Sequence, residues 1–361
     1  MTIWRWAGYF SDTPVPHQIT LGEGNTPLVH SRRLGPDLGL NQLYFKLETG
    51  NPTGSYKDRY AAAAISDMLA HGKSRVIGTS SGNTGSAVAA YCARAGITCE
   101  IAILETTPIG KTKQMLAYGA KLYKVRGMGL DAAITAQIIE TIQRKAAQPD
   151  AKLQISAYTF SSEGMAGVQT ISYELAEQAA AFGLTMRHVF SPSGGGGLTL
   201  AVARGFAGLA DRGELTNPPA VHCVQPEGNN TIAGPLRDGA ERAVACVGTT
   251  EISGLQVSSV IDGDRVIAAC RASGGTGHLV TDQDVWRLQR RMAREEGIFC
   301  EPAGAVALAG AVGALQRREI GPDDPIVCLV TGIGFKDPPS FDRMIEGEDC
   351  PIIDVDQIDN Q

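Results

Sequence analysis

The sequence predicts an α/β protein of two domains, each with an open, mostly parallel sheet flanked by helices. Three observations predict this class. Short β-like runs alternate with helical stretches, glycine stands just past several helices, and loops rich in small or polar residues follow the strands. Strand–loop–helix alternation implies right-handed βαβ units, and such units build parallel sheets covered by helices. At 361 residues the chain is long enough for two domains.

The predicted elements follow one another from residue 60 onward. We expect strands over 75–79, 98–104, 121–125, 187–190, 220–224 and 325–330. We expect helices over 60–70, 85–95, 111–118 and 303–315. The last helix is apolar but only about 13 residues long, which suits a buried core helix and is too short to span a bilayer. Ligands of such sheets bind at the carboxyl ends of the strands, so the loops there are the candidate site.

Composition excludes several classes of function. The net charge is −6, which argues against nucleic acid or an anionic membrane as the main partner. No secretory signal is visible in the first residues. The eight cysteines form no C-x-x-C pair and the six histidines are scattered, so neither a metal site nor a disulfide framework is indicated. We therefore expect reduced thiols and a cytoplasmic protein.

Lys57 is the first candidate for chemistry. Pro52 and Gly54 predict a turn, and Ser55 is a candidate cap for the helix over 60–70. Lys57 then falls in the first turn of that helix, where an acidic residue would suit the helix dipole better. A lysine in this position is typical of an amine nucleophile. The alternative is a solvated surface lysine.

A loop of small polar residues follows the strand over 75–79. It reads Ser80-Ser81-Gly82-Asn83-Thr84 and leads into the helix over 85–95. Hydroxyls and backbone amides at a helix N-terminus bind carboxylates or phosphates, and the Asn83 amide could bond a ring oxygen. The alternative is ordinary helix capping, which serine and threonine perform routinely.

Four consecutive glycines follow the strand over 187–190, namely Gly194, Gly195, Gly196 and Gly197. Each costs up to about 1 kcal/mol of conformational entropy relative to alanine. A helix start gains nothing structural from this run, whereas a glycine-rich turn can point several N–H groups at one anion. The run therefore predicts a phosphate site.

A serine hydrolase is a competing interpretation. Residues 78–82 match G-x-S-x-G with Ser80 as the nucleophile, and His222 or His278 would have to complete the triad. This interpretation leaves Lys57 and the four glycines unexplained, and the short motif has many false matches.

Taken together, these segments resemble the fold-type II pyridoxal-phosphate enzymes of the tryptophan synthase beta-like superfamily, and most closely the threonine synthase family. The resemblance covers nearly the whole chain. Its segments are 22–28, 51–59, 81–85, 297–303 and 331–338.

The resemblance implies a role for each candidate around pyridoxal 5′-phosphate. Lys57 would hold the cofactor as a Schiff base and move the Cα proton of the substrate, and Thr331 would face the pyridine nitrogen. A hydroxyl cannot keep that nitrogen protonated as a carboxylate would, so the site favours elimination and replacement chemistry. The remaining cofactor residues would be Asn83 at the 3′ oxygen and Gly194, Gly195, Gly196 and Gly197 at the 5′-phosphate.

The substrate would be a small amino acid. By the same resemblance, Ser80, Ser81 and Thr84 would receive its α-carboxylate. Threonine synthases usually carry Asn-Pro-His-Arg where residues 160–164 here read Phe-Ser-Ser-Glu-Gly, so an arginine for the substrate phosphate is missing. Lys111 could replace it, or could be an exposed helix-start lysine. The four glycines are closer to the loop of the serine/threonine dehydratases.

The resemblance further implies a cofactor cleft between a larger domain, 1–59 and 161–361, and a smaller mobile domain, 60–160. The expected reaction is elimination of phosphate from O-phosphohomoserine followed by addition of water at Cβ. The alternatives are β-elimination or β-replacement on serine, threonine or a related amino acid, and a non-catalytic cofactor-binding or amino-acid-binding protein. A homodimer is expected from the family.

Overall fold

The computed structural model describes residues 1–80, 82–128, 130–355 and 358. The strands are β1 (Leu28–His30), β2 (Leu43–Leu47), β3 (Arg75–Thr79), β4 (Thr98–Leu104), β5 (Lys121–Val125), β6 (Ala151–Gln154), β7 (His188–Pro192), β8 (Ala220–Pro226), β9 (Gly277–Val280) and β10 (Ile326–Val330). The helices are α1 (Ala7–Phe10), α2 (Leu34–Leu38), α3 (Lys57–Ala70), α4 (Asn83–Ala95), α5 (Ile109–Ala117), α6 (Ala132–Ala146), α7 (Ser162–Val168), α8 (Thr170–Ala181), α9 (Gly197–Asp211), α10 (Ala233–Arg237), α11 (Gly263–Ala272), α12 (Asp282–Glu296), α13 (Pro302–Gln316) and α14 (Pro338–Met344).

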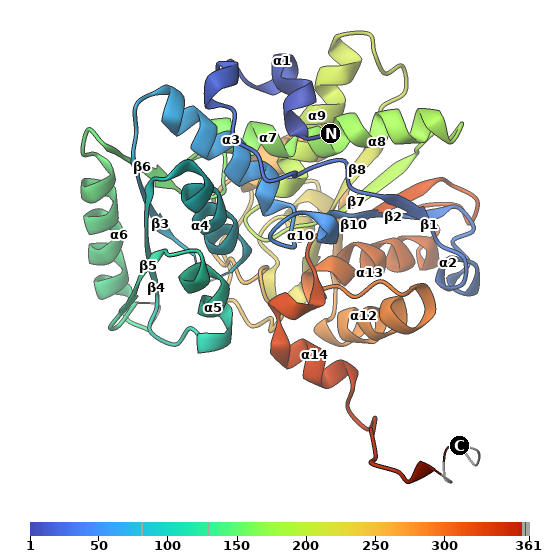
Figure 1. The fold of residues 1–361 in the computed structure, drawn as a ribbon. Coiled ribbons are helices and arrows are strands. Elements are labelled where there is room, and N and C mark those ends of the chain that lie inside the picture. The colour runs from blue at the N-terminus through green and yellow to red at the C-terminus, as the bar shows by residue number, and fades with distance from the viewer. Residues whose placement is uncertain (81, 129, 356–357, 359–361) are drawn as a thin grey trace.

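The strands form two sheets, each covered by helices on both faces (Figure 1). One sheet has six strands in the order β1-β2-β10-β7-β8-β9, in which only the β1–β2 pair is antiparallel. The other has four parallel strands in the order β5-β4-β3-β6. Helix α6 lies on one face of the smaller sheet and α4 and α5 lie on the other. The predicted α/β class with two mostly parallel sheets is confirmed.

The individual elements agree closely with the sequence-based expectation. The strands predicted over 75–79, 98–104 and 121–125 are β3, β4 and β5 with the same bounds. The strand predicted over 187–190 begins and ends later, as β7, because its pairing with β8 continues through Pro192. The helix expected over 303–315 is α13, whose residues are buried nearly all round. The sequence did not indicate β1, β2, β6 or β9.

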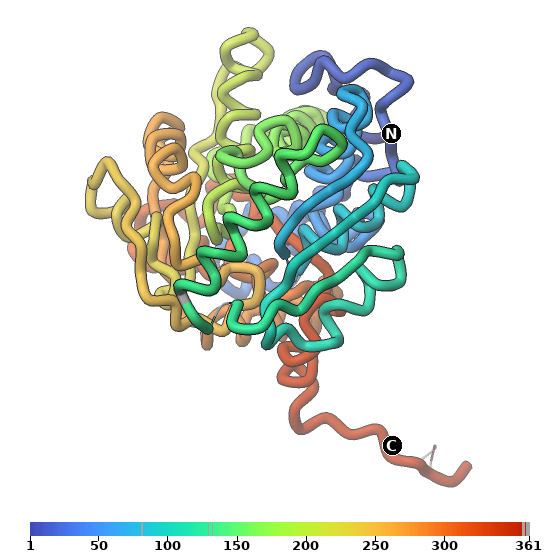
Figure 2. The backbone as a smooth tube through the Cα atoms, turned by 90° about the vertical axis from the view of Figure 1, so that its left-hand side faces the viewer, coloured from blue at the N-terminus to red at the C-terminus, as the bar shows by residue number. Residues whose placement is uncertain are grey.

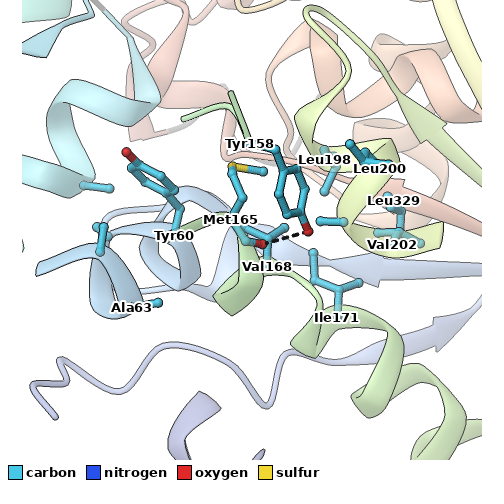
Figure 3. Close-up of a cluster of buried hydrophobic side chains, with 14 of the residues drawn as sticks. Tyr60, Ala63, Tyr158, Met165, Val168, Ile171, Leu198, Leu200, Val202 and Leu329 are labelled. Atoms are coloured by element: carbon cyan, nitrogen blue, oxygen red, sulfur yellow. Dashed lines mark hydrogen bonds between the residues drawn. The ribbon is translucent and has the colours of Figure 1, made fainter. Parts of the chain in front are cut away.

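Helix α3 is locked in place by unusually close packing on α7. Gly164 and Gly167 of α7 leave the room, because a Cβ at Gly167 would lie 2.5 Å from the carbonyl oxygen of Arg59. Figure 3 shows Tyr60 of α3 beside Met165 and Tyr158, whose hydroxyl donates to the carbonyl oxygen of Met165 at 3.4 Å. Burial of such side chains contributes about 1.5–3 kcal/mol each. The start of α3 therefore has little freedom to move.

The chain beyond α14 runs away from the two sheets (Figure 2). Among the described residues, no helix combines the length and apolarity that crossing a bilayer requires.

Candidate active site

A cavity of about 470 Å³ lies at the carboxyl ends of strands from both sheets. The loops after β3 and β6 of the smaller sheet and after β7 and β10 of the larger sheet all contribute to it, as expected for parallel sheets. Its lining brings together the predicted site residues that the structure describes, which are Lys57, Ser80, Asn83, Thr84, Lys111, Gly194, Gly195, Gly196, Gly197 and Thr331. Ser81 lies outside the described residues.

The turn before Lys57 forms as predicted. Gly54 has a φ of +87°, which favours glycine, and its N–H donates to the carbonyl oxygen of Asn51 at 2.8 Å. The expectation that Ser55 caps the helix is wrong. Tyr56 is the cap residue, and no side chain makes a capping hydrogen bond. Ser55 instead forms an antiparallel bridge with Gly332, so its backbone belongs to the segment before the helix.

That bridge holds Lys57 near Thr331. The N–H of Tyr56 donates to the carbonyl oxygen of Thr331 at 3.0 Å, so the residue before Lys57 is joined to the loop after β10. The two candidate residues come from positions far apart in the sequence, and this short pairing sets their separation.

Arg59, in the first turn of α3, anchors the start of that helix to neighbouring segments. Its guanidinium is fully buried and donates to both carboxylate oxygens of Glu48 at 2.8 Å and to those of Glu174 at 2.7 and 2.8 Å. Lys46 completes the cluster with a 2.8 Å bond to Glu174. Burial alone would raise the pKa of Glu174, but the charge of Arg59 and its hydrogen bonds outweigh burial and lower it. The paired charges of Arg59, Glu48 and Glu174 fix α3 two residues beyond Lys57.

The amine of Lys57 lies in the cavity and is held by a serine. Its Nζ donates to Oγ of Ser156 at 2.6 Å, and Oγ of Ser156 is 2.8 Å from Oγ1 of Thr84. The same amine lies 4.6 Å from the centre of the Tyr56 ring. The surface-lysine alternative therefore does not describe Lys57.

In the polar loop after β3, the Ser80 side chain hydrogen-bonds to backbone N–H groups a few residues further on. Oγ of Ser80 accepts hydrogen bonds from the N–H groups of Gly82 and Gly85 at 3.3 and 3.2 Å. The Ser80 oxygen thus binds the backbone at the start of α4, whose cap residue is Gly82, and the Ser80 hydroxyl hydrogen is not used in these two bonds. The side-chain amide of Asn83 donates to the carboxylate of Glu301, at 3.0 and 2.9 Å from its two oxygens.

The glycine run forms the turn that leads into the 15-residue helix α9. Of the four glycines only Gly196 has a positive φ, +97°, and a Cβ there would lie 2.5 Å from Cγ2 of Val266. Oγ of Ser193, just before the run, is buried and has no hydrogen-bond partner. A glycine-rich turn at the start of a long helix suits an anion such as a phosphate monoester.

Lys111 also faces the cavity, but its charge already has a partner. Its Nζ donates to Oγ of Ser253 at 2.6 Å and lies 3.4 Å from Oδ1 of Asp337. Lys111 belongs to α5 beside the smaller sheet, whereas Ser253 and Asp337 follow β8 and β10 of the larger one.

The hydrolase alternative finds no support in the geometry. His222 and His278 lie in β8 and β9, are buried, and stand 3.1 Å apart between Nδ1 and Nε2. Neither belongs to the cavity lining that contains Ser80. With His188 they form a row of imidazoles in the larger sheet, separate from the candidate site.

Two residues of the cavity, Ser156 and Glu301, were not predicted from the sequence. Ser156 follows β6, a strand that the sequence did not indicate, so nothing marked it. Glu301 belongs to a segment that resembles the threonine synthases, yet no role was assigned to it. Its carboxylate accepts from Asn83 and, at 3.1 Å, from Oγ1 of Thr331. Burial raises the pKa of Glu301.

Comparison with known proteins agrees with this geometry. Residues 19–332 match the family described as "Pyridoxal-phosphate dependent enzyme". A threonine synthase from Methanocaldococcus jannaschii is 31% identical over 352 residues, which cover 97% of this chain and 84% of the relative. A threonine synthase from Methanosarcina acetivorans is 32% identical over 340 residues, which cover 93% of this chain and 80% of the relative. The predicted resemblance is confirmed.

Solved structures of other proteins have a fold similar to that of this chain. The processed form of threonine deaminase isoform 2 from Solanum lycopersicum has a TM-score of 0.73 at 24% identity, covering 95% of this chain and 92% of that one. Maize serine racemase has a TM-score of 0.73 at 22% identity, and the match covers 90% of this chain and 92% of the racemase chain. At these identities the similarity concerns the fold alone.

Proposed function

Since this chain belongs to the pyridoxal-phosphate dependent enzyme family, we propose that Lys57 binds the cofactor covalently and that the enzyme acts as a lyase on a small amino acid. The observation that carries the proposal is the single cavity that joins the Lys57 amine to the glycine run. An amine and a candidate phosphate-binding turn in one cavity match the aldehyde and the phosphate of pyridoxal phosphate.

The residues present fit this cofactor. The turn at Gly196 offers backbone N–H donors at a helix start to a phosphate. Asn83 and Thr331 contribute polar atoms to the lining of the same cavity, and the family resemblance assigns them to the ring. Leu255, Val257 and Ile261 supply an apolar surface next to the glycines. When bound, pyridoxal phosphate supplies an electron sink for charge that develops at the substrate Cα.

The chain itself supplies binding and proton transfer. Ser156 orients the amine of Lys57, which is placed to take and return protons once substrate is bound. Thr84 lies on the other side of Ser156, and it would receive the substrate carboxylate together with Ser80 and Ser81. A Lys57 amine held 2.6 Å from one hydroxyl has few orientations, which reduces the entropy cost of proton transfer.

For the reaction we favour the threonine synthase type, elimination of phosphate from O-phosphohomoserine followed by addition of water at Cβ. Two threonine synthases of 31% and 32% identity support this choice. Lys111 is the cation available for the leaving phosphate, because Lys57 and Lys111 are the two cationic side chains among the described lining residues. A substrate phosphate would compete with Asp337 for Lys111.

The second candidate is β-elimination or β-replacement on serine, threonine or a related amino acid. It is favoured by the pairing of Lys111 with Asp337 and by the lack of arginine among the described lining residues. A substrate without a phosphate group would leave that pair intact.

One experiment separates the two reactions. Purified protein loaded with pyridoxal phosphate is mixed with O-phosphohomoserine, and phosphate and threonine are measured. The same protein is given serine and threonine, and ammonia and 2-oxo acid are measured. Release of phosphate with threonine supports the first reaction, and release of ammonia from the second set alone supports the alternative. Absence of every product contradicts the proposed function.

The cofactor link is tested on the same sample. Borohydride treatment followed by peptide mapping should mark Lys57. A mark on Lys111 or Lys336 instead would refute the assignment.

The proposal extends to the domain movement, oligomeric state and cellular compartment of the enzyme. Residues 60–160 would move relative to 1–59 and 161–361, with the Lys111–Ser253 bond joining the two parts in the structure described. We propose a homodimer in the cytoplasm, where the eight cysteines, all free in the structure, would remain reduced.

A further inference from the structure

Asp337 places a nearly enclosed carboxylate next to the amine of Lys111. Its side chain is 9% exposed, and its Oδ1 lies 3.4 Å from Nζ of Lys111. Lys111 lines the cavity, whereas Asp337 is not among the described lining residues, so the carboxylate acts on the cavity through the amine. Asp337 directly precedes α14, where an aspartate commonly caps the helix, yet its side chain makes no capping hydrogen bond. The carboxylate therefore needs another explanation, and its contact with Lys111 is the one to consider.

The contact between Lys111 and Asp337 leaves the amine able to bind a ligand. A close hydrogen bond between an ammonium and a carboxylate is about 2.7–2.9 Å long, and 3.4 Å exceeds this length. The close bond of Lys111 goes to Oγ of Ser253, at 2.6 Å. An ammonium carries three hydrogens, so one remains for an anion in the cavity after Ser253 and Asp337 are served.

A second bond fixes the position of Asp337 relative to Lys111. Nζ of Lys336 donates to Oε1 of Gln114 at 2.6 Å. Lys111 and Gln114 are three residues apart on α5 and share one face of that helix, and their partners Lys336 and Asp337 are adjacent in the chain. The N–H of Asp337 also donates to the carbonyl oxygen of Gly334 at 3.1 Å. Asp337 therefore has little freedom to withdraw when an anion reaches Lys111.

A fixed carboxylate at this place opposes the binding of a phosphate. The phosphate is attracted by the ammonium of Lys111 and repelled by Asp337, and both effects are stronger where protein excludes water than in bulk solvent. The proposed elimination releases a phosphate into the cavity in every cycle. A phosphate held by an unopposed buried lysine would leave slowly, and slow product release limits turnover.

We propose that Asp337 is a positioning residue that keeps Lys111 at the cavity wall and weakens its affinity for phosphate, so that the phosphate released from the substrate departs. The inference rests on the proposed function, in which Lys111 binds the phosphate of the substrate. It adds to that function a residue outside the cavity that sets the balance between binding the substrate phosphate and releasing it as product.

The test measures phosphate binding directly. Protein loaded with pyridoxal phosphate, whose own phosphate site is then filled, is titrated with inorganic phosphate by calorimetry without an amino acid. Asp337→Asn removes the opposing charge and should tighten phosphate binding about 10-fold, and KM for O-phosphohomoserine should fall in parallel. Damage to the fold does not produce such a gain in affinity. Asp342→Asn removes an exposed carboxylate of α14 outside the cavity lining and should match wild type.

Further variants show whether the charge of Asp337 acts through Lys111. In a Lys111→Met background, Asp337→Asn should change phosphate binding by less than about twofold, because the amine on which the carboxylate acts is absent. Asp337→Glu keeps the charge and should bind phosphate as weakly as wild type. Asp337→Ser supplies a second neutral side chain if Asp337→Asn does not fold.

The outcomes separate this inference from the proposed function. Unchanged or weaker phosphate binding in the neutral variants, at wild-type cofactor content and Tm, would overturn the inference and leave the proposed function standing. Equal gains in the presence and absence of Lys111 would overturn it as well. A wild-type protein that binds no cofactor would contradict the proposed function itself.

Discussion

The amine of Lys57 and the hydroxyl of Ser156 are joined by a hydrogen bond of 2.6 Å that connects the start of α3 to the loop after β6. The two residues are 99 positions apart in the sequence. Because Lys57 donates, the Ser156 oxygen accepts, and the Ser156 hydrogen is free for Thr84 at 2.8 Å. Ser156 thus connects the residue proposed to move protons with a residue proposed to bind the substrate.

Replacement of Ser156 by alanine should slow catalysis more than it weakens binding. Without its acceptor the Lys57 amine samples more orientations, and we expect kcat to fall about 10- to 100-fold with a smaller change in KM. Steady-state kinetics measure both constants, with whichever candidate substrate gives product in the assay under Proposed function. Ser156→Thr retains the hydroxyl and should recover most of kcat. Equal rates for Ser156→Ala and wild type would show that the hydrogen bond does not orient Lys57.

Replacement of Lys111 by methionine should distinguish a phosphorylated substrate from an unphosphorylated one. Loss of a charged hydrogen bond costs about 1.5–3 kcal/mol, so KM for O-phosphohomoserine should rise about 10- to 100-fold. Kinetics with serine or threonine should change little. Lys113→Met is the matched control, because Lys113 lies exposed on the same helix outside the cavity lining. An unchanged KM for O-phosphohomoserine would exclude Lys111 from phosphate binding.

Replacement of Arg59 by methionine should destabilise the fold. The change leaves Glu48 and Glu174 buried with one partner fewer, and breaking a buried ion pair costs about 3–5 kcal/mol. Urea denaturation followed by circular dichroism measures the free energy of unfolding. Arg94→Met, at an exposed site on α4, should change it by less than about 0.5 kcal/mol. Similar losses in both variants would contradict the anchoring role of Arg59.

The histidine row should make stability depend on pH. His222 lies 3.0 Å from His188 and 3.1 Å from His278, and burial lowers the pKa of His278 to about 3. The unfolded chain takes up protons near pH 6.5, and the folded chain does so only at lower pH. The neutral His278 therefore contributes to the free energy of unfolding above pH 6.5. This contribution is lost as the pH falls through that value, by up to about 1.4 kcal/mol per pH unit.

Urea denaturation between pH 7.5 and 5 tests this dependence in a His278→Gln variant. The free energy of unfolding should fall less steeply in the variant than in wild type. The comparison of slopes is needed because burial raises the pKa of Asp58 to about 7, and this carboxyl stabilises the fold as pH falls through the same window. His71→Gln, at an exposed site, should keep the wild-type slope. Parallel curves for His278→Gln and wild type would show that His278 does not titrate as proposed.

Most of the fold could be predicted because its signals are local. The strands β3, β4 and β5 are short runs rich in β-branched, aliphatic or aromatic residues and bounded by turns, and Gly96 and Gly119 mark the helix ends that precede β4 and β5. The strands that were missed are short or lack such boundaries. β1 has three residues with only Leu28 buried, so it carries no alternating pattern, and its pairing with β2 depends on a partner elsewhere in the chain.

The sequence by itself determined the α/β class and the two cavity loops after β3 and β7, since glycine, serine and asparagine at strand ends follow from local backbone chemistry. Only the tertiary structure decided how these residues are held. Ser55 became part of a bridge to Gly332 instead of a cap, and Ser156 and Glu301 acquired their contacts from distant segments. A hydrogen bond depends on the distance and direction between two groups, and for groups far apart along the chain both are set by packing.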